Sequence, residues 1–156
     1  MKLLYNAKGG KVEWLEKERI VVKTFHSYIH GEELRAAFNA GYEQLKKSKA
    51  KKWLSDNRGL PVYKPEDVDW INTDWLPRML KAGWEYWALV EPDSNVGLLT
   101  MEKFRFYARM GIELHKFRTV GQALSWLGSV DRAAQKHVRS EYRGIDLGSP
   151  LLIYEG

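Results

Sequence analysis

The stretch that decides the fold begins with Lys52-Trp53-Leu54-Ser55 and runs directly into Asp56-Asn57-Arg58-Gly59. The first four residues are typical of a short buried strand, which we expect to be central in its sheet. The polar residues after them predict a long loop at the carboxyl end of that strand. Trp70 and Trp75 flank the next predicted helix start. Because ligand sites in open α/β sheets lie where a strand ends and a helix begins, segment 51–83 is the first candidate for a site.

The chain before this stretch predicts a hairpin and a helix. Segments 11–15 and 19–25 are apolar or rich in β-branched residues, and the polar turn 16–18 joins them as two antiparallel strands. Gly31-Glu32-Glu33 opens a helix, because acidic residues suit the positive end of the helix dipole. The apolar residues of this helix recur at spacings of three and four, which predicts a face packed on a sheet. These residues are Leu34, Ala37, Phe38, Gly41, Tyr42 and Leu45.

Prolines and a glycine set the predicted helix boundaries that follow. Pro65, which is followed by two acidic residues, indicates the first turn of a short helix. Pro77 lacks an N–H group, which is harmless only in the first turn of a helix. The next helix should therefore begin near 73–75, with a cap among residues 72–74, and it should stop at Gly83.

The remaining elements alternate between strand and helix. Segment 84–90 is the clearest strand, 100–110 is helical with Gly111 at its end, and 112–117 alternates like an edge strand. Thr119 and Gln122 match a capping box for the last helix. The order predicts a single-domain α/β fold with a mixed, mostly parallel sheet and flanking helices, opened by an antiparallel hairpin. We expect the domain to span 1–130 and a C-terminal extension to span 131–156, with its packing left open.

Composition excludes several classes of protein. The 156 residues include no cysteine, which rules out disulfides, thiolate catalysis and cysteine-based zinc sites. The N-terminus lacks the apolar core of a signal peptide, and no apolar run approaches the length that spans a bilayer, so we expect a cytoplasmic protein with no integral membrane segment. The net charge of +5 is partly concentrated in the lysines of segment 46–52, which are typical of a solvated helix C-terminus. A nucleic-acid partner is not expected, because interleaved aromatic and basic residues are missing.

Candidate site residues lie at two predicted strand ends and at the helix start between them. They are Asp56, Asn57, Arg58, Lys64, Trp70, Trp75, Glu91 and Asp93. Asp56 can be a general base, a phosphate acceptor or the cap of its own turn, and Arg58 can bind an anion or pair with an acidic neighbour. The sequence contains no GxGxxG, Walker, GxSxG or HExxH motif, and we expect no metal and no cofactor. His26 and His30 are four residues apart in a predicted strand end and loop, so they are not expected to form a metal pair.

Three segments in this order resemble the STAS superfamily, and more narrowly its SpoIIAA-like branch. They are Trp53-Leu54-Ser55-Asp56, Trp84-Glu85-Tyr86-Trp87-Ala88-Leu89-Val90 and Phe117-Arg118-Thr119-Val120-Gly121-Gln122-Ala123-Leu124-Ser125-Trp126-Leu127. The last matches a closing F-R-x-x-x-x-A-x-x-W-L pattern. The resemblance covers roughly residues 10–128 and implies a small bacterial signalling protein. Regulatory members carry a phosphorylated serine in a D-S pair, whereas this chain has the reversed pair Ser55-Asp56, so no phosphorylation is expected there.

The resemblance implies a non-enzymatic module that binds a protein partner or a small anionic or apolar ligand at the rim formed by 56–75 and 91–95, with a homodimer possible. Two alternatives stay open. The SpoIIAA-like branch is also similar to the CRAL-TRIO fold, which implies a carrier of a lipid or another apolar ligand. The other is an enzyme that uses Asp56 with Glu91 or Asp93. An apolar cavity of several hundred Å³ would favour the carrier, and converging carboxylates with an ion would favour the enzyme.

Overall fold

The described residues of the computed structural model, 1–91 and 101–139, contain one six-stranded sheet whose strands follow the order of the sequence. The strands are β1 (Lys2–Ala7), β2 (Gly10–Leu15), β3 (Ile20–Tyr28), β4 (Lys52–Val62), β5 (Tyr86–Val90) and β6 (Glu113–Phe117). The first three pair antiparallel, and β3 to β6 pair parallel. The predicted α/β class, with its mostly parallel sheet and opening hairpin, is confirmed.

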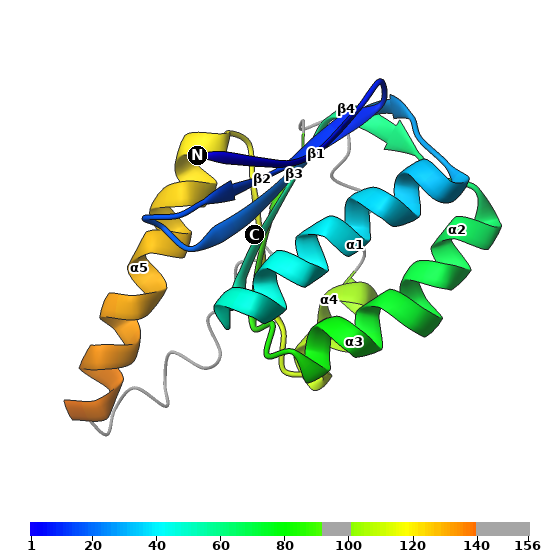
Figure 1. Ribbon diagram of the computed structural model, residues 1–156. Coiled ribbons are helices and arrows are strands. Elements are labelled where there is room, and N and C mark those ends of the chain that lie inside the picture. Colours follow the sequence, from blue (N-terminus) through cyan, green and yellow to red (C-terminus); the bar gives the residue numbers. More distant parts are fainter. Residues whose placement is uncertain (92–100, 140–156) are drawn as a thin grey trace.

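Helices cover both faces of this sheet. The helices α1 (Gly31–Ser48), α2 (Pro65–Trp70) and α3 (Leu76–Lys81) lie on one side, and α5 (Val120–Arg139) lies on the other (Figure 1). The helix α4 (Met101–Arg109) packs beside β6, with Tyr107 against Trp87 of β5. The larger core lies between α1, α3 and the sheet, and a smaller one lies under α5. The region between the first group of helices and the parallel strands is therefore where a site can form.

A glycine lets α1 approach the sheet closely. A Cβ atom on Gly41 would lie 2.5 Å from Cη2 of Trp53, a side chain that is itself buried in the core. Any larger residue would have to displace that indole, which makes the absence of a side chain a packing requirement here. The close approach fixes the indole of Trp53 beneath α1.

The strand β4 is longer than the sequence predicts, and the long loop predicted after it is wrong. Residues beyond Asp56 continue the strand to Val62, because β3 extends alongside and pairs with it at Gly59 and Val62. The other neighbour, β5, pairs with β4 only as far as Asp56. Pro61 therefore lies where one side of the strand is free of ladder pairing, a position that tolerates a residue with no N–H.

The predicted helix start near 73–75 is also wrong. The chain stays helical from Pro65 to Lys81 and passes through the π-helical segment η1 (Ile71–Trp75). The N–H of Leu76 donates to the carbonyl of Ile71, five residues back. A π-turn of this kind loosens the normal hydrogen-bond ladder next to Pro77, so the proline does not have to begin a new helix. Trp70 and Trp75 thus lie within one helical run and do not flank its start.

Other local predictions are confirmed. Gly83 ends α3 with a φ of 105°, and the N–H of Trp84 donates to the carbonyl of Met79. The hydroxyl of Thr119 accepts a hydrogen bond from the N–H of Gln122 at 3.1 Å, as expected of a cap. The helix α5 then continues to Arg139, beyond the domain limit at 130 that the sequence suggested.

Candidate functional site

A cavity of about 480 Å³ lies between the sheet and the helices α1 to α4. Its floor comes from three parallel strands: Lys23 of β3 is paired with Ser55 of β4, and Ser55 with Leu89 of β5. Because side chains two apart in a strand share a face, Asn57 extends this row toward the carboxyl ends of the strands. The cavity is therefore built at the edge of the parallel sheet where α/β proteins place ligands.

Aromatic side chains form a large part of the walls. They are Phe38, Trp53, Tyr63, Trp75, Trp84, Trp87, Phe106 and Tyr107. Several meet edge to face, with ring centroids 4.8 Å apart for Phe38 and Trp75 and 5.0 Å apart for Trp87 and Tyr107. Contacts of this geometry hold rings in place and leave apolar surface facing inward. The cavity consequently suits a mainly apolar ligand.

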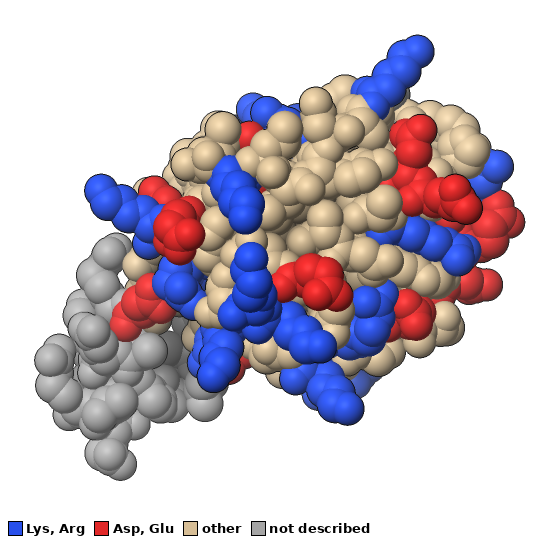
Figure 2. All heavy atoms as spheres, viewed as in Figure 1, with Lys and Arg blue, Asp and Glu red and all other residues tan. Residues whose placement is uncertain are grey.

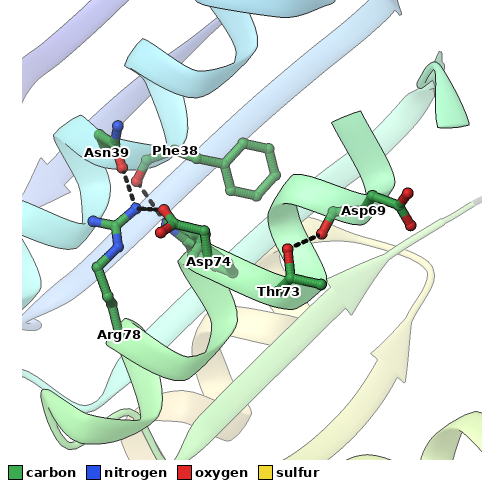
Figure 3. Close-up of polar contacts among 7 residues, drawn as sticks. Phe38, Asn39, Asp69, Thr73, Asp74 and Arg78 are labelled. Carbon is green, nitrogen blue, oxygen red and sulfur yellow. Dashed lines mark hydrogen bonds and ion pairs between the residues drawn. The ribbon is translucent and has the colours of Figure 1, made fainter. Parts of the chain in front are cut away.

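The helical run α2–η1–α3 is fastened over this cavity by polar contacts (Figure 3). Arg78 reaches from α3 to Asn39 of α1 at 2.8 Å and pairs with Asp74 at 2.8 Å. Within the π-segment, the hydroxyl of Thr73 donates to the carbonyl of Asp69. The contact of Arg78 with Asn39 holds the helical run on α1, over the cavity.

Lys23 is the polar group at the centre of this apolar site. Its side chain comes from the middle of β3, the residue is only 3% exposed, and Nζ donates to the hydroxyl of Tyr63 at 2.8 Å. The ammonium also lies 4.5 Å from the ring centre of Phe25 and 5.1 Å from that of Phe38. Burial lowers the pKa of Lys23 to about 7, although Asp56 and Glu91 act in the opposite direction. Near neutral pH the residue therefore exists in both its charged and its neutral form.

Ser55 is held between two indoles. Its Oγ accepts hydrogen bonds from Nε1 of Trp53 at 3.1 Å and from Nε1 of Trp87 at 3.0 Å. A hydroxyl has two acceptor sites and one proton, so these bonds leave the proton as the group that Ser55 can offer to a ligand. The residue is buried at the floor of the cavity.

Two further polar groups lie at the end of the cavity nearest to the carboxyl ends of the strands. The buried Oδ1 of Asn57 has no hydrogen-bond partner among the residues that the structure describes. Glu91 forms an ion pair with Nζ of Lys116 at 3.1 Å. Because buried polar atoms are nearly always hydrogen-bonded, the Oδ1 of Asn57 is a natural acceptor for a donor group of a ligand.

Asp56 and Arg58 form a separate pair on the other face of the sheet. Asp56 lies two residues after Leu54 in β4, so both side chains are on the same face of the sheet. Because Leu54 packs under α5, Asp56 faces away from the cavity. Nε of Arg58 donates to its carboxylate at 2.8 Å and Nη2 at 2.7 Å. Burial raises the pKa of Asp56, but the hydrogen bonds from Arg58 outweigh this, so that the pKa lies below its ordinary value. A carboxylate held in this way is a poor proton acceptor.

Replacing Arg58 with alanine should lower the free energy of unfolding by roughly 1–3 kcal/mol at pH 7, because the buried carboxylate of Asp56 loses its partner. The loss should shrink as the pH falls below 3.8, the ordinary pKa of an aspartate, and through the lower pKa of Asp56 in the folded protein, because a protonated carboxyl no longer needs a cationic partner. Urea denaturation at pH 7 and at pH 3 measures both values. An equal loss at the two pH values would contradict this account of the pair.

The eight predicted site residues separate into groups. Asn57, Trp75 and Glu91 line the cavity together. Lys64 is at the N-terminus of α2, and Trp70 is half-buried, with the guanidinium of Arg35 5.3 Å from its ring centre. Neither of these lines the cavity, and Asp93 lies outside the described residues. The cavity thus overlaps the predicted rim only in part.

Sequence reasoning missed Lys23 and Tyr63. The available signal was the lysine inside the β-branched run Ile20-Val21-Val22-Lys23-Thr24, which was itself predicted to be a strand. Period-two alternation places Lys23 on the same face as Val21 and Phe25, two residues that the structure buries completely. A charged residue on the inner face of a strand indicates a polar group that has a partner or a function.

No protein-family model, no curated protein and no solved structure matches this chain. Within the described ranges, no helix has both the length and the apolar character needed to cross a membrane. The same residues hold no group of three or more histidine, aspartate or glutamate side chains placed to bind a metal ion. On the face shown in Figure 2, basic and acidic side chains are interspersed. The case for a function therefore depends on the cavity.

Proposed function

We propose that this protein is a binding module for a small, mainly apolar molecule that carries one polar group. The observation that supports this most strongly is the aromatic cavity of about 480 Å³ with the buried amine of Lys23 in its wall. Pockets for drug-sized ligands measure roughly 300–1,000 Å³ and combine apolar walls with a few placed polar groups. The aromatic rings would hold the body of the ligand, and Lys23, Ser55 and Asn57 would orient its polar group.

The proposed chemistry of the polar group follows from the amine. In its charged form Lys23 favours an anionic group, such as a carboxylate or a sulfonate, in surroundings where few water molecules compete. In its neutral form it favours a hydrogen-bonding carbonyl or hydroxyl. The preferred ligand should therefore depend on pH near the pKa of about 7.

The family assignment is also a proposal. We infer that the chain is a bacterial, cytoplasmic member of the SpoIIAA-like branch of the STAS superfamily, with the ligand role that the similarity to CRAL-TRIO folds suggests. In support, Ala123 and Leu127 of the closing pattern are buried under the sheet, and Trp126 stacks on His115 with ring centres 4.1 Å apart. Through these contacts, residues of the closing pattern pack the last helix against the sheet.

A protein partner is the second candidate. The observation that favours it is the pair Tyr28 and Val62, which lie opposite each other at the ends of β3 and β4 and are both exposed. Exposed apolar residues are common on protein surfaces, however, whereas a preformed aromatic cavity with a buried amine is not. The cavity is therefore the stronger basis for a function.

Two fluorescent probes can test ligand binding. 1-Anilinonaphthalene-8-sulfonate is an aromatic anion, and N-phenyl-1-naphthylamine has the same rings without the sulfonate. Both should bind the wild-type protein and quench the tryptophans that line the cavity. In Lys23→Met, the affinity for the sulfonate should fall about tenfold at pH 6, which corresponds to ~1.4 kcal/mol, while the neutral probe should bind as before.

A matched pair of variants tests the location. Val68 lines the cavity and is 40% exposed, whereas Val62 is 61% exposed and does not line it. Val68→Trp should block binding of both probes, and Val62→Trp should leave it unchanged. Equal effects of the two substitutions, or no binding to the wild-type protein, would reject the cavity as the site.

A further inference from the structure

Two buried lysines of neighbouring strands differ in their partners. Lys52, 6% exposed, is paired with Asp131 at 2.7 Å. Lys23 is buried to a similar degree, but among the described residues no carboxylate lies within 4.0 Å of its Nζ. Its hydrogen bond is made instead to the neutral hydroxyl of Tyr63. Lys52 thus has a carboxylate as its partner, whereas the partner of Lys23 is a phenol hydroxyl.

The free-amine form of Lys23 is abundant at neutral pH. A lysine with an ordinary pKa near 10.4 is about 0.04% neutral at pH 7. Burial brings the pKa of Lys23 down to about 7, against the charges of Asp56 and Glu91, so that its neutral form is populated at that pH. A neutral amine in an apolar pocket is the form of lysine that attacks carbonyl carbon.

We propose that Lys23 captures an apolar aldehyde or ketone, bound in the cavity, as a Schiff base. The inference rests on the proposed function, because the carbonyl compound must first occupy the aromatic cavity. Lys23 is one of the residues that line that cavity, and its Nζ lies 2.8 Å from the hydroxyl of Tyr63, another lining residue. Ser55, beside it on β4, has a proton to offer to the carbonyl oxygen.

The chemistry needs no redox partner. The lone pair of Nζ forms a bond to the carbonyl carbon, and the π electrons of the C=O bond move to oxygen, which takes a proton as nitrogen loses one. This gives a carbinolamine. The C–O bond then breaks, the oxygen leaves as water with a second proton from nitrogen, and a C=N bond remains. Tyr63, 2.8 Å from Nζ, stays a neutral phenol because burial raises its pKa, so that it can donate a hydrogen bond to the departing oxygen.

Reductive trapping tests the proposal. The protein is incubated at pH 7 with 2-naphthaldehyde and sodium cyanoborohydride, which converts an imine to a stable secondary amine. Intact mass should rise by the mass of the aldehyde less one oxygen atom, and peptide mapping should place the adduct on Lys23. We expect Lys23 to react at least tenfold faster than Lys52. Labelling of Lys23 should decline below pH 7, as the amine becomes protonated.

Variants separate the site from general lysine reactivity. Lys23→Met should lose the fast adduct, and Lys52→Met should keep it, with circular dichroism showing that both are folded. Tyr63→Phe retains the amine but removes the hydroxyl, and it should slow labelling several-fold. Fast labelling in Lys23→Met, or equal labelling of Lys23 and Lys52 in the wild-type protein, would overturn the proposal.

A non-reactive analogue distinguishes this inference from the proposed function. 2-Naphthalenemethanol has the same rings and cannot form an imine, and its binding is read from quenching of tryptophan fluorescence. If the alcohol binds and the aldehyde is not trapped at Lys23, Schiff-base formation is wrong and the binding function stands. If neither compound binds, both proposals fail.

Discussion

Replacing Trp75 with alanine will lower the free energy of unfolding by roughly 3–5 kcal/mol. The residue is 3% exposed, and its indole packs edge to face on Phe38 and on Trp53, with ring centres 4.8 Å and 5.1 Å away. Nε1 also donates to the carbonyl of Phe38 at 2.9 Å, so the substitution leaves that buried oxygen without its donor. Urea denaturation followed by circular dichroism measures the loss.

Trp70→Ala is the matched control. Trp70 lies five residues earlier in the same helical run, is half-buried, and contacts the guanidinium groups of Arg35 and Arg78 at its surface. Its removal should cost less than half as much as the removal of Trp75. A similar cost for both substitutions would show that Trp75 does not have the central packing position described above.

The parts of the fold that the sequence predicts are those with local chemical causes. The helix of 31–48 follows from apolar spacing, the end of α3 from a glycine that adopts positive φ, and the start of α5 from the hydroxyl of Thr119. The alternation of strands and helices then leaves few topologies open, because parallel connections are right-handed. The mostly parallel sheet follows from these local features.

Features that depend on distant partners were not predictable in the same way. The strand β1 has no fully buried residue and pairs only with β2, so it has no clear alternating pattern. The polar end of β4 is a strand only because β3 extends beside it. Propensity rules assign Asn57, Gly59 and Pro61 to a loop, and tertiary pairing overrides those rules.

The candidate site was predictable only near the carboxyl ends of the strands, because the rest of it depends on contacts between residues distant in the sequence. Asn57 comes soon after the apolar pair Trp53-Leu54, and Glu91 comes directly after the end of β5. Polar residues that follow an apolar strand segment are a local signal that the sequence carries. Tyr63 reaches Lys23 across 40 residues of sequence, and no spacing rule connects the two. Asp56 is of a residue type that is common in functional sites, but strand alternation places its side chain on the face of the sheet opposite the cavity.

Replacing Lys23 with methionine will stabilise the protein below pH 7. The unfolded chain binds a proton at this lysine with a pKa of 10.5, and the folded protein does so with a pKa of about 7. Between these values the unfolded state holds more protons, so that wild-type stability rises with pH across that window. Below pH 7 both states are protonated, and the folded state bears the whole cost of the buried charge.

The size of the effect follows from the same shift. A pKa difference of this magnitude corresponds to roughly 5 kcal/mol, and the loss of the hydrogen bond to Tyr63 takes back about 1 kcal/mol. The attraction of Asp56 and Glu91 for the ammonium is already contained in the pKa of about 7. We expect Lys23→Met to exceed the wild type by roughly 4 kcal/mol at pH 6 and to lose this advantage by about pH 10.5.

Denaturant titrations of both proteins from pH 6 to pH 10.5 test this, because taking the difference removes the titration of all groups that they share. Lys52→Met is the control, since it removes a buried lysine that Asp131 already pairs, and no gain in stability is expected. A Lys23→Met protein less stable than the wild type at pH 6 would show that the amine is stabilised where it lies. The amine of Lys23 would then be a structural cation, and the proposed ligand site would lose its central polar group.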